Sequence, residues 1–229
     1  MRIITLIIAL LIAEVCNAQK TVAYPTLNDF INNNVRQLGT VFTNKRVFDD
    51  GMFAGATLYD FLTTDKRTNE ELATACFALQ KDDSLFINLL GAIDVYGYAY
   101  VKEQFGTYLY FTSIGSNLLE HRGYIMEKSK DRTTKADVNY YSRNPIAAPS
   151  KQLYAVNRND MRGAGKMASS KQFSYLYGTQ EGQVFLLTPT MLEDMLSNRP
   201  ELLRLYTSSG SPDNDGVYLW YLKRLFNKE

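Results

Sequence analysis

Three pairs of segments alternate between apolar and polar residues, and each pair is joined by a short run of turn residues. "TACFALQ" and "SLFINLL" flank the charged turn at 81–83. "YGYAYVKE" and "TYLYFTSI" flank "QFG", in which Gly106 suits a turn that needs a positive φ. The third pair is Phe173–Tyr177 and Val184–Leu187, across "GTQEG". These patterns predict three antiparallel hairpins. Further strands are predicted over 39–48, over Ala56–Phe61 and over 151–160.

Helical spacing appears near both ends of the chain. Thr26 is a good N-cap for a short helix over Leu27–Asn34. Thr188 followed by Pro189 is typical of a helix start, and a second helical segment follows Pro200. A shorter helix over 116–128 is interrupted by Gly123 in the sequence pattern. The C-terminal segment is predicted to be an amphipathic helix that docks on the sheet, with its apolar face formed by Val217, Trp220, Tyr221 and Leu225.

Together these elements predict an α+β fold, an antiparallel sheet of consecutive β-hairpins with a few short helices at the chain ends. A single domain is expected over residues 19–229. The polar, proline-containing stretch over about 127–151 is expected to be a long loop.

The first residues read as a secretory signal peptide over 1–18. Arg2 supplies a positive charge, an apolar run follows, and cleavage is expected after Ala18. The mature chain holds no second apolar run long enough to span a bilayer. A secreted or periplasmic location is therefore expected. An alternative is a lipoprotein anchored through Cys16, although Glu14 and Val15 stand where a lipobox has small residues.

Several sequence blocks resemble a group of uncharacterised secreted proteins of Bacteroidota. They are "YPTLNDFINN", "KDDSLFINLL", "GYAYVKEQFGTYLYF" and "GQVFLLTPTMLEDMLSNRPELLRLY". Most of their residues serve packing and turns. The resemblance implies export in a bacterial envelope setting, and it implies a domain without an assigned activity.

Composition excludes some functions. The chain of 229 residues has a formal net charge of +1, with 21% charged residues of interleaved sign, so no basic surface for nucleic acid is expected. His121 is the one histidine, which excludes a histidine-rich zinc site and leaves a Ser-His-Asp triad only this residue. Once the signal peptide is removed, Cys76 is the one cysteine, in an apolar setting typical of a buried thiol.

Other motif matches are partial. "RGAGKMASS" at 162–170 lacks the first glycine and the final Ser or Thr of a phosphate loop. "SPDNDGVY" carries Asp213 and Asp215 but lacks the full ligand pattern of a calcium loop, so a turn that caps the last helix is expected. No cofactor and no metal site is predicted.

Tyrosines of the middle hairpin are the candidate binding residues. Alternation places Tyr96, Tyr98 and Tyr100 on one face of the first strand and Tyr108 and Tyr110 on one face of the second. Aligned rows would form a cross-strand ladder, half exposed, over an aliphatic face in the core. Such a ladder is either a stabilised strand pair covered by the chain itself or a platform for a sugar or a partner protein.

Two functional hypotheses follow. The first is an exported, non-enzymatic binding or structural protein of the bacterial envelope, with a glycan or an envelope protein as partner. The alternative is a carboxylate-based hydrolase acting on glycan, for which Asp94, Glu103 and Glu120 are the candidate acids.

Overall fold

The computed structural model describes residues 21–48, 56–130 and 172–226. The predicted signal peptide, the predicted strand over 151–160, the partial phosphate-loop match and residues 131–151 of the predicted loop lie outside these ranges. The strands, in chain order, are β1 (Thr21–Tyr24), β2 (Arg36–Gln37), β3 (Phe42–Val47), β4 (Thr57–Leu62), β5 (Ala78–Lys81), β6 (Ser84–Asn88), β7 (Tyr98–Phe105), β8 (Tyr108–Ser113), β9 (Phe173–Gly178) and β10 (Gln183–Leu186). The helices are α2 (Leu27–Ile31), α3 (Lys66–Thr74), α4 (Leu89–Ile93), α5 (Leu119–Lys130), α8 (Pro189–Leu196), α9 (Pro200–Ser208) and α10 (Asp215–Phe226).

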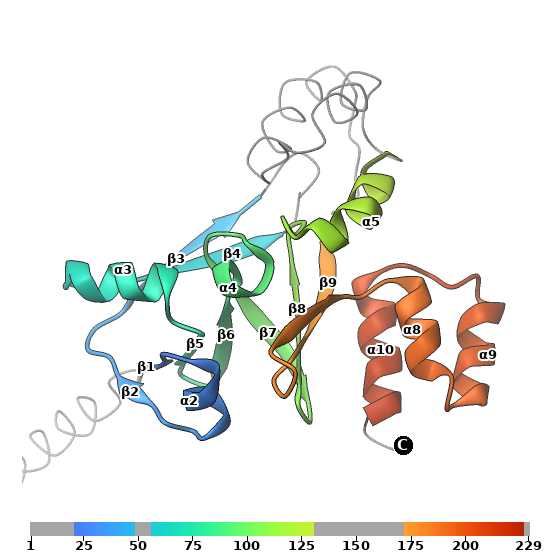
Figure 1. Cartoon of the computed structure of the whole chain (residues 1–229), viewed down its shortest axis with the longest axis horizontal. Helices are drawn as coiled ribbons and strands as arrows, with labels where there is room; N and C mark the ends of the chain where they lie inside the picture. Colours follow the sequence, from blue (N-terminus) through green and yellow to red (C-terminus); the bar gives the residue numbers. More distant parts are fainter. Residues whose placement is uncertain (1–20, 49–55, 131–171, 227–229) are drawn as a thin grey trace, which may run out of the picture.

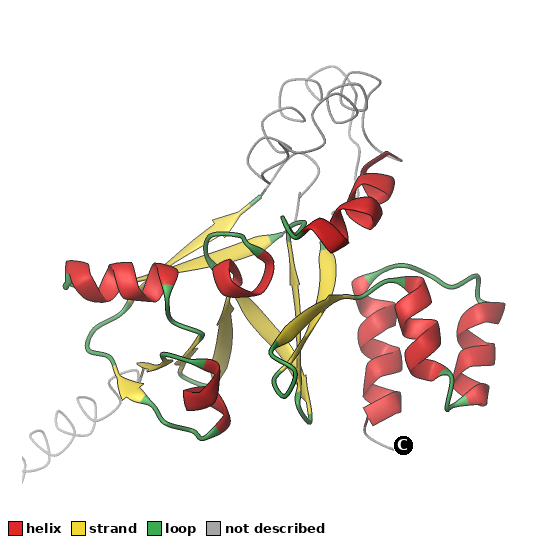
Figure 2. Cartoon of the chain, viewed as in Figure 1, coloured by secondary structure: helices red, strands yellow, loops and turns green. Residues whose placement is uncertain are grey.

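One sheet runs through the molecule in the order β10-β9-β8-β7-β6-β5-β1-β2 (Figure 1). The hairpin of β3 and β4 joins it through a single pairing of Tyr59 with Tyr98 on β7. Neighbouring strands are antiparallel, and the three predicted hairpins form as β5–β6, β7–β8 and β9–β10. The predicted α+β class is therefore confirmed, with helices arranged around an open antiparallel sheet (Figure 2).

Turn residues take the backbone conformations that the hairpins require. Gly106 has φ 57° and Gly182 has φ 65°, in the left-handed region that glycine adopts without strain. Asp82, in the charged turn between β5 and β6, has φ 55°, and aspartate is among the few other residues that tolerate this region. The local turn chemistry read from the sequence thus determines where these three hairpins reverse.

Two helices lie between strands, where the sequence pattern gave no signal for them. In α3, Asp65 is the N-cap and its side chain accepts a hydrogen bond from the backbone N–H of Thr68 at 2.7 Å. Leu72 is the buried residue of this helix, and its sequence, KRTNEELAT, is otherwise almost entirely polar, so the sequence holds no apolar stripe that would predict it. In α4, the Asn88 side chain accepts from the Leu90 backbone N–H at 2.9 Å. Capping, rather than amphipathic spacing, marks both helix starts.

Helix α5 differs from its prediction at both ends. It begins at Leu119 and not at residue 116, and it continues through Gly123. It also extends to Lys130, so residues 127–130 are helical and the loop predicted over 127–151 does not begin where the sequence suggested. One glycine in a helix interior lowers its stability by roughly 1 kcal/mol without ending it.

The buried face of α10 was predicted correctly at three of its four residues, since Tyr221 is buried and Val217 and Leu225 pack against the same cluster, but it was wrong at Trp220. Trp220 was expected in that face but is 39% exposed, and the guanidinium of Arg224 lies over its ring at 3.4 Å. Tyr218 and Leu222, which were not predicted in that face, are buried beside Tyr221. The helix packs into a cluster that includes residues of α8 and α9 as well as strand residues (Figure 1), and these neighbours determine which stripe of the helix is covered.

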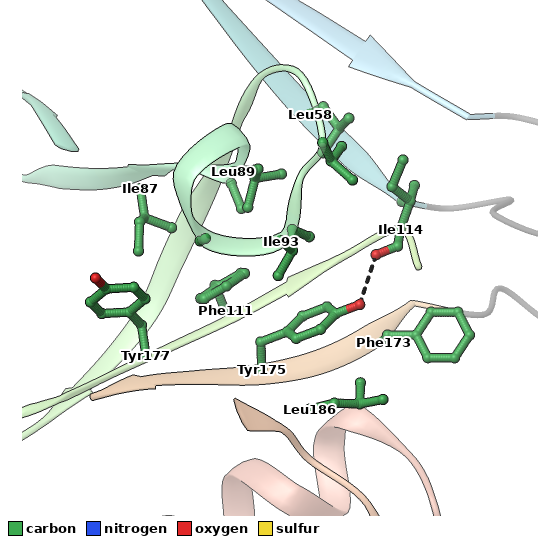
Figure 3. Close-up of a cluster of buried hydrophobic side chains, with 14 of the residues drawn as sticks. Leu58, Ile87, Leu89, Ile93, Phe111, Ile114, Phe173, Tyr175, Tyr177 and Leu186 are labelled. Atoms are coloured by element: carbon green, nitrogen blue, oxygen red, sulfur yellow. Dashed lines mark hydrogen bonds between the residues drawn. The ribbon is translucent and has the colours of Figure 1, made fainter. Parts of the chain in front are cut away.

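Central strands are buried on both faces. On β8, Phe111 points into a cluster with Tyr175, Ile93 and Leu89, and the Tyr175 hydroxyl there donates to the Ile114 carbonyl at 3.1 Å (Figure 3). Tyr110, the next residue along, belongs to the opposite cluster with the C-terminal helices. A strand covered on both sides is apolar at successive positions, which explains the sequence "YLYF".

Candidate binding surface

The tyrosine rows of the middle hairpin do not align, so the cross-strand ladder that aligned rows would form is absent. The turn at Gly106 sets the register, which places Phe105 opposite Tyr108 and Glu103 opposite Tyr110. A bulge between Val101 and Glu103 then shifts the pairing further. The register of a hairpin follows from its turn, and β7 pairs with β8 only beyond its two tyrosines.

Each tyrosine row instead faces a different neighbour. Tyr98 and Tyr100 pair with Asn88 and Phe86 of β6. Tyr108 and Tyr110 pair with Gly178 and Leu176 of β9. The single strand β7 thus has β6 and β4 as neighbours over its first residues and β8 over its last, and the two tyrosine rows belong to different parts of the sheet.

Burial also separates the five candidate tyrosines. Tyr96 is 62% exposed and Tyr100 is 42% exposed, whereas Tyr98 is 2% and Tyr110 is 0% exposed. Tyr108 is half-buried, with its ring 5.7 Å from that of Phe226 on α10. Tyr98 and Tyr110 are therefore covered by the chain itself and cannot contact a ligand, which corrects their assignment as binding residues.

Tyr110 belongs to a network of tyrosines and aspartates that fastens α10 to the sheet. Its hydroxyl donates to a carboxylate oxygen of Asp215, and Lys102 pairs with the other oxygen at 2.7 Å. Asp213 accepts from the hydroxyls of Tyr218, at 2.8 Å, and of Tyr124 on α5. Both aspartates of the partial calcium motif are thus occupied by side chains of the protein.

The turn before α10 is also a cap, as the sequence predicts. The Asn214 side chain accepts from the Val217 backbone N–H at 3.0 Å. Within residues 21–48, 56–130 and 172–226, no three His, Cys, Asp or Glu side chains are grouped so that they could hold a metal ion. The loop before α10 therefore has a structural role, because its side chains cap the helix and bind it to the rest of the fold.

A row of aromatic rings crosses the sheet from β4 to β6 and β7, and we call Tyr59, Phe61, Phe86, Tyr98 and Tyr100 the aromatic row. Ring centroids lie 5.1 Å apart for Phe61–Tyr98, 5.0 Å for Phe61–Phe86, 5.0 Å for Tyr59–Phe86 and 5.7 Å for Phe86–Tyr100. All four contacts are edge-to-face, an arrangement that aromatic quadrupoles favour. The row is one continuous set of ring contacts that no single sequence segment contains, with Phe61, Phe86 and Tyr98 buried in the core.

The two ends of the aromatic row differ in exposure. At the buried end, the Tyr98 hydroxyl donates to the Leu72 carbonyl of α3 at 2.6 Å, and burial raises the pKa of Tyr98 well above its usual range. At the open end, Tyr100 is 42% exposed and Tyr59 is half-buried. The rings of Tyr59 and Tyr100 both pack against Phe86, and burial, followed by the effect of Tyr100, raises the pKa of Tyr59.

Charged residues border the open end. Lys45 on β3 lies opposite Tyr59 in the strand register and is exposed. It makes no ion pair with any residue of the described ranges. The surface therefore combines apolar rings, tyrosine hydroxyls and an available cation, a mixture suited to binding an amphipathic ligand.

The structure places the three candidate acids on different elements. Glu103 pairs with Lys223 at 2.8 Å, Asp94 ends α4 in a left-handed conformation, and Glu120 lies in the first turn of α5. His121 is buried with its ring 6.1 Å from that of Tyr175. Cys76 is buried in the cluster beneath α3, and burial raises the pKa of its thiol.

Sequence reasoning missed Tyr59 and Phe86 as members of the aromatic row. Alternation in "TLYDFL" places Tyr59 and Phe61 on one face of β4, and Phe86 lies in the predicted strand "SLFIN". That signal was present, but it does not say which strands pair. The contact of Phe86 with both Tyr59 and Tyr100 follows only from the order of strands in the sheet.

In the part of the chain that the structure describes, no helix has the length and apolar character needed to cross a membrane. Comparison with protein families gives one result: a family model described as "Family of unknown function (DUF6563)" matches residues 22–229. Searches among curated proteins and among solved structures found no match. The matched region includes both the aromatic row and the C-terminal helices.

Proposed function

This chain belongs to DUF6563, a family of unknown function, and from that premise we propose that it is an exported, non-enzymatic binding protein of a bacterial envelope. Its ligand is a glycan, bound at the open end of the aromatic row by Tyr100 and Tyr59. The proposal has two parts, location and binding, which rest on different residues and are tested separately.

Location rests on the N-terminus. Arg2 precedes an apolar run from Ile3 to Ala13 that is broken only by Thr5, and the residues between this run and Gln19 are mostly small or polar, which is typical of a cleaved signal peptide. Export by this route delivers the protein to the periplasm or beyond. Mass spectrometry of the protein recovered from a Bacteroidota host should find Gln19 at the N-terminus. A lipid-modified Cys16 would instead make it a lipoprotein, and an intact Met1 would contradict export.

Binding rests on one observation, the exposure of Tyr100 above a rigid aromatic support. The Tyr100 ring contacts Phe86, which is 8% exposed and in turn contacts Phe61 and Tyr59. A tyrosine held in this way presents apolar surface and a hydroxyl at little cost in conformational entropy. Sugars have the matching chemistry, with an apolar face of C–H groups and hydroxyls at the edge.

The proposal is tested by screening the mature chain on a glycan array and measuring each hit by titration calorimetry. Tyr100→Ala should weaken binding by about tenfold or more, since truncating an aromatic anchor at an interface commonly costs over 1 kcal/mol. Tyr96→Ala is the matched control. Tyr96 is 62% exposed, but it precedes β7 and its ring contacts none of the aromatic row.

Three results would contradict the proposal. The first is that no glycan on the array binds the protein. The second is that Tyr100→Ala binds a glycan as tightly as the unmodified chain does. The third is that Tyr96→Ala weakens glycan binding as much as Tyr100→Ala does. A separate assay with glycan and peptide hydrolase substrates addresses the non-enzymatic part. Turnover that Glu103→Gln abolishes would favour the carboxylate-based hydrolase instead.

A further inference from the structure

The outer edge of β3 is an unpaired strand edge with its own chemistry. Among the described residues, β3 pairs on one side only, with β4. Every residue of this strand except Arg46 is exposed, including Phe42 at 58% and Val47 at 48%. Leu62, opposite Phe42 on β4, is 47% exposed. Exposed apolar residues beside an open strand edge mark a surface for pairing with another chain.

Backbone geometry identifies which groups face outward. The Phe48 backbone N–H donates to the Ala56 carbonyl at 3.0 Å, so Phe48 points its backbone groups toward β4. Backbone groups alternate in direction along an antiparallel strand. Arg46 and Asn44 therefore bond to β4, while Lys45 and Val47 direct their N–H and carbonyl groups away from it. These outward groups are the ones that an added strand would bond.

The positive charge of Lys45 indicates which kind of strand would bind at this edge. Lys45 lies in the middle of the exposed edge and has no ion pair within the described residues. Arg46, the other cation of β3, pairs with Asp60 at 2.8 Å and so is already neutralised. A second copy of this strand, antiparallel to the first, would bring two Lys45 side chains close together. An acidic strand would instead meet Lys45 with the opposite charge.

We propose that β3 binds an extended peptide by strand addition, antiparallel to its outer edge, with an acidic residue of the peptide facing Lys45. Apolar residues two positions away on the peptide lie beside Thr43 and Val47, which share a face with Lys45. Main-chain hydrogen bonds hold the peptide, and Lys45 determines its preferred sequence.

Two capped, dye-labelled heptapeptides test this proposal, Thr-Val-Thr-Glu-Thr-Val-Thr and the same peptide with lysine at the centre. Fluorescence anisotropy with the mature chain should show the glutamate peptide binding about tenfold more tightly than the lysine peptide. Lys45→Glu should reverse that preference. Lys66→Glu removes an exposed cation at the start of α3 and should leave the preference unchanged.

Lys45→Pro tests the main-chain hydrogen bonds of the proposed peptide. The backbone N–H of Lys45 points outward and is not part of the β3–β4 ladder. Proline at this position is therefore compatible with the hairpin but blocks strand addition. Binding of both peptides should be lost while the circular dichroism spectrum is retained. If Lys45→Pro misfolds, the charge reversal by Lys45→Glu still decides the question. Tyr100→Ala should leave peptide binding unchanged, which keeps this proposal distinct from glycan binding.

The proposal is overturned if the two peptides bind equally, if Lys45→Glu leaves the preference unchanged, or if a folded Lys45→Pro variant binds as the unmodified chain does. Concentration-dependent dimerisation that Lys45→Pro abolishes would also overturn it, because the edge would then pair with a second copy of the chain.

Discussion

Tyr98 and Tyr100 lie two residues apart on the same face of β7, yet truncating them should have very different effects on stability. Tyr98 is 2% exposed and contacts Phe61 at 5.1 Å between ring centroids. Removing such a ring leaves a cavity, and Tyr98→Ala should lower the free energy of unfolding by about 3–5 kcal/mol. Tyr100 is 42% exposed and has one ring contact, with Phe86, so Tyr100→Ala should cost about 1 kcal/mol or less.

The hydroxyl of Tyr98 contributes a smaller part. It donates to the Leu72 carbonyl at 2.6 Å, and the Asn88 side chain donates to the same carbonyl at 3.0 Å. Tyr98→Phe keeps the ring and leaves that carbonyl with its second donor. The expected loss is therefore about 1 kcal/mol, the usual net value of one hydrogen bond.

Urea unfolding followed by circular dichroism measures all these differences, provided that the slope of the transition is the same for each variant. For a chain of this size, 1 kcal/mol corresponds to a shift of roughly 2–4 °C in Tm. Tyr96→Ala, at a 62% exposed position, is the control and should change the free energy of unfolding by less than about 0.5 kcal/mol. Equal losses for Tyr98→Ala and Tyr100→Ala would refute the reasoning, because they would place both residues in a half-exposed ladder.

Gly97 has φ 115°, and an added Cβ would lie 2.5 Å from Nη2 of Arg46, so Gly97→Ala should destabilise the protein by over about 1 kcal/mol. Gly39→Ala, where a Cβ meets nothing within 4 Å, should be close to neutral in the same urea unfolding assay. Burial raises the pKa of Tyr206 from 10.0 to about 12, so its contribution to stability is complete below pH 10 and is lost as the pH rises through 12. Urea midpoints measured between pH 9 and 12 should fall, and less steeply in Tyr206→Phe; an equal slope in that variant would contradict the assignment. Cys76 is 3% exposed and burial raises the pKa of its thiol, so a thiol reagent should label it slowly in the native protein and rapidly in urea. Equally fast labelling in both states would show that the thiol is accessible.

Much of the local structure could be predicted from the sequence. The three hairpins follow from alternation and from turn residues such as Gly106, whose φ of 57° needs no partner elsewhere in the chain. The capping box of α2 follows equally locally, since the Thr26 side chain accepts from the Asp29 backbone N–H at 3.1 Å. The start of α8 at Pro189, capped by Thr188, is a third case. Each of these features depends on residues within a few positions of one another.

The candidate site could be predicted only in part. Tyr100 was identified as a candidate, but its neighbours Phe86 and Tyr59 come from other strands, and their contact depends on the order β4-β7-β6. Exposure could not be read from the sequence either. The alternation of Tyr98 and Tyr100 gives both the same face, and it is α3, through Leu72, that covers one of them.

The sequence by itself determined the class of fold, the hairpins, and the helix starts marked by Thr26 and Thr188. The tertiary structure alone decided which aromatic faces are covered and which strand edge stays open. The physical reason is the distance along the sequence between the residues that interact. Turns and caps are fixed by bonds between near neighbours, whereas the Tyr110 hydroxyl is buried by bonds to Asp215, a residue 105 positions away. Burial of that kind exists only once distant segments have packed together.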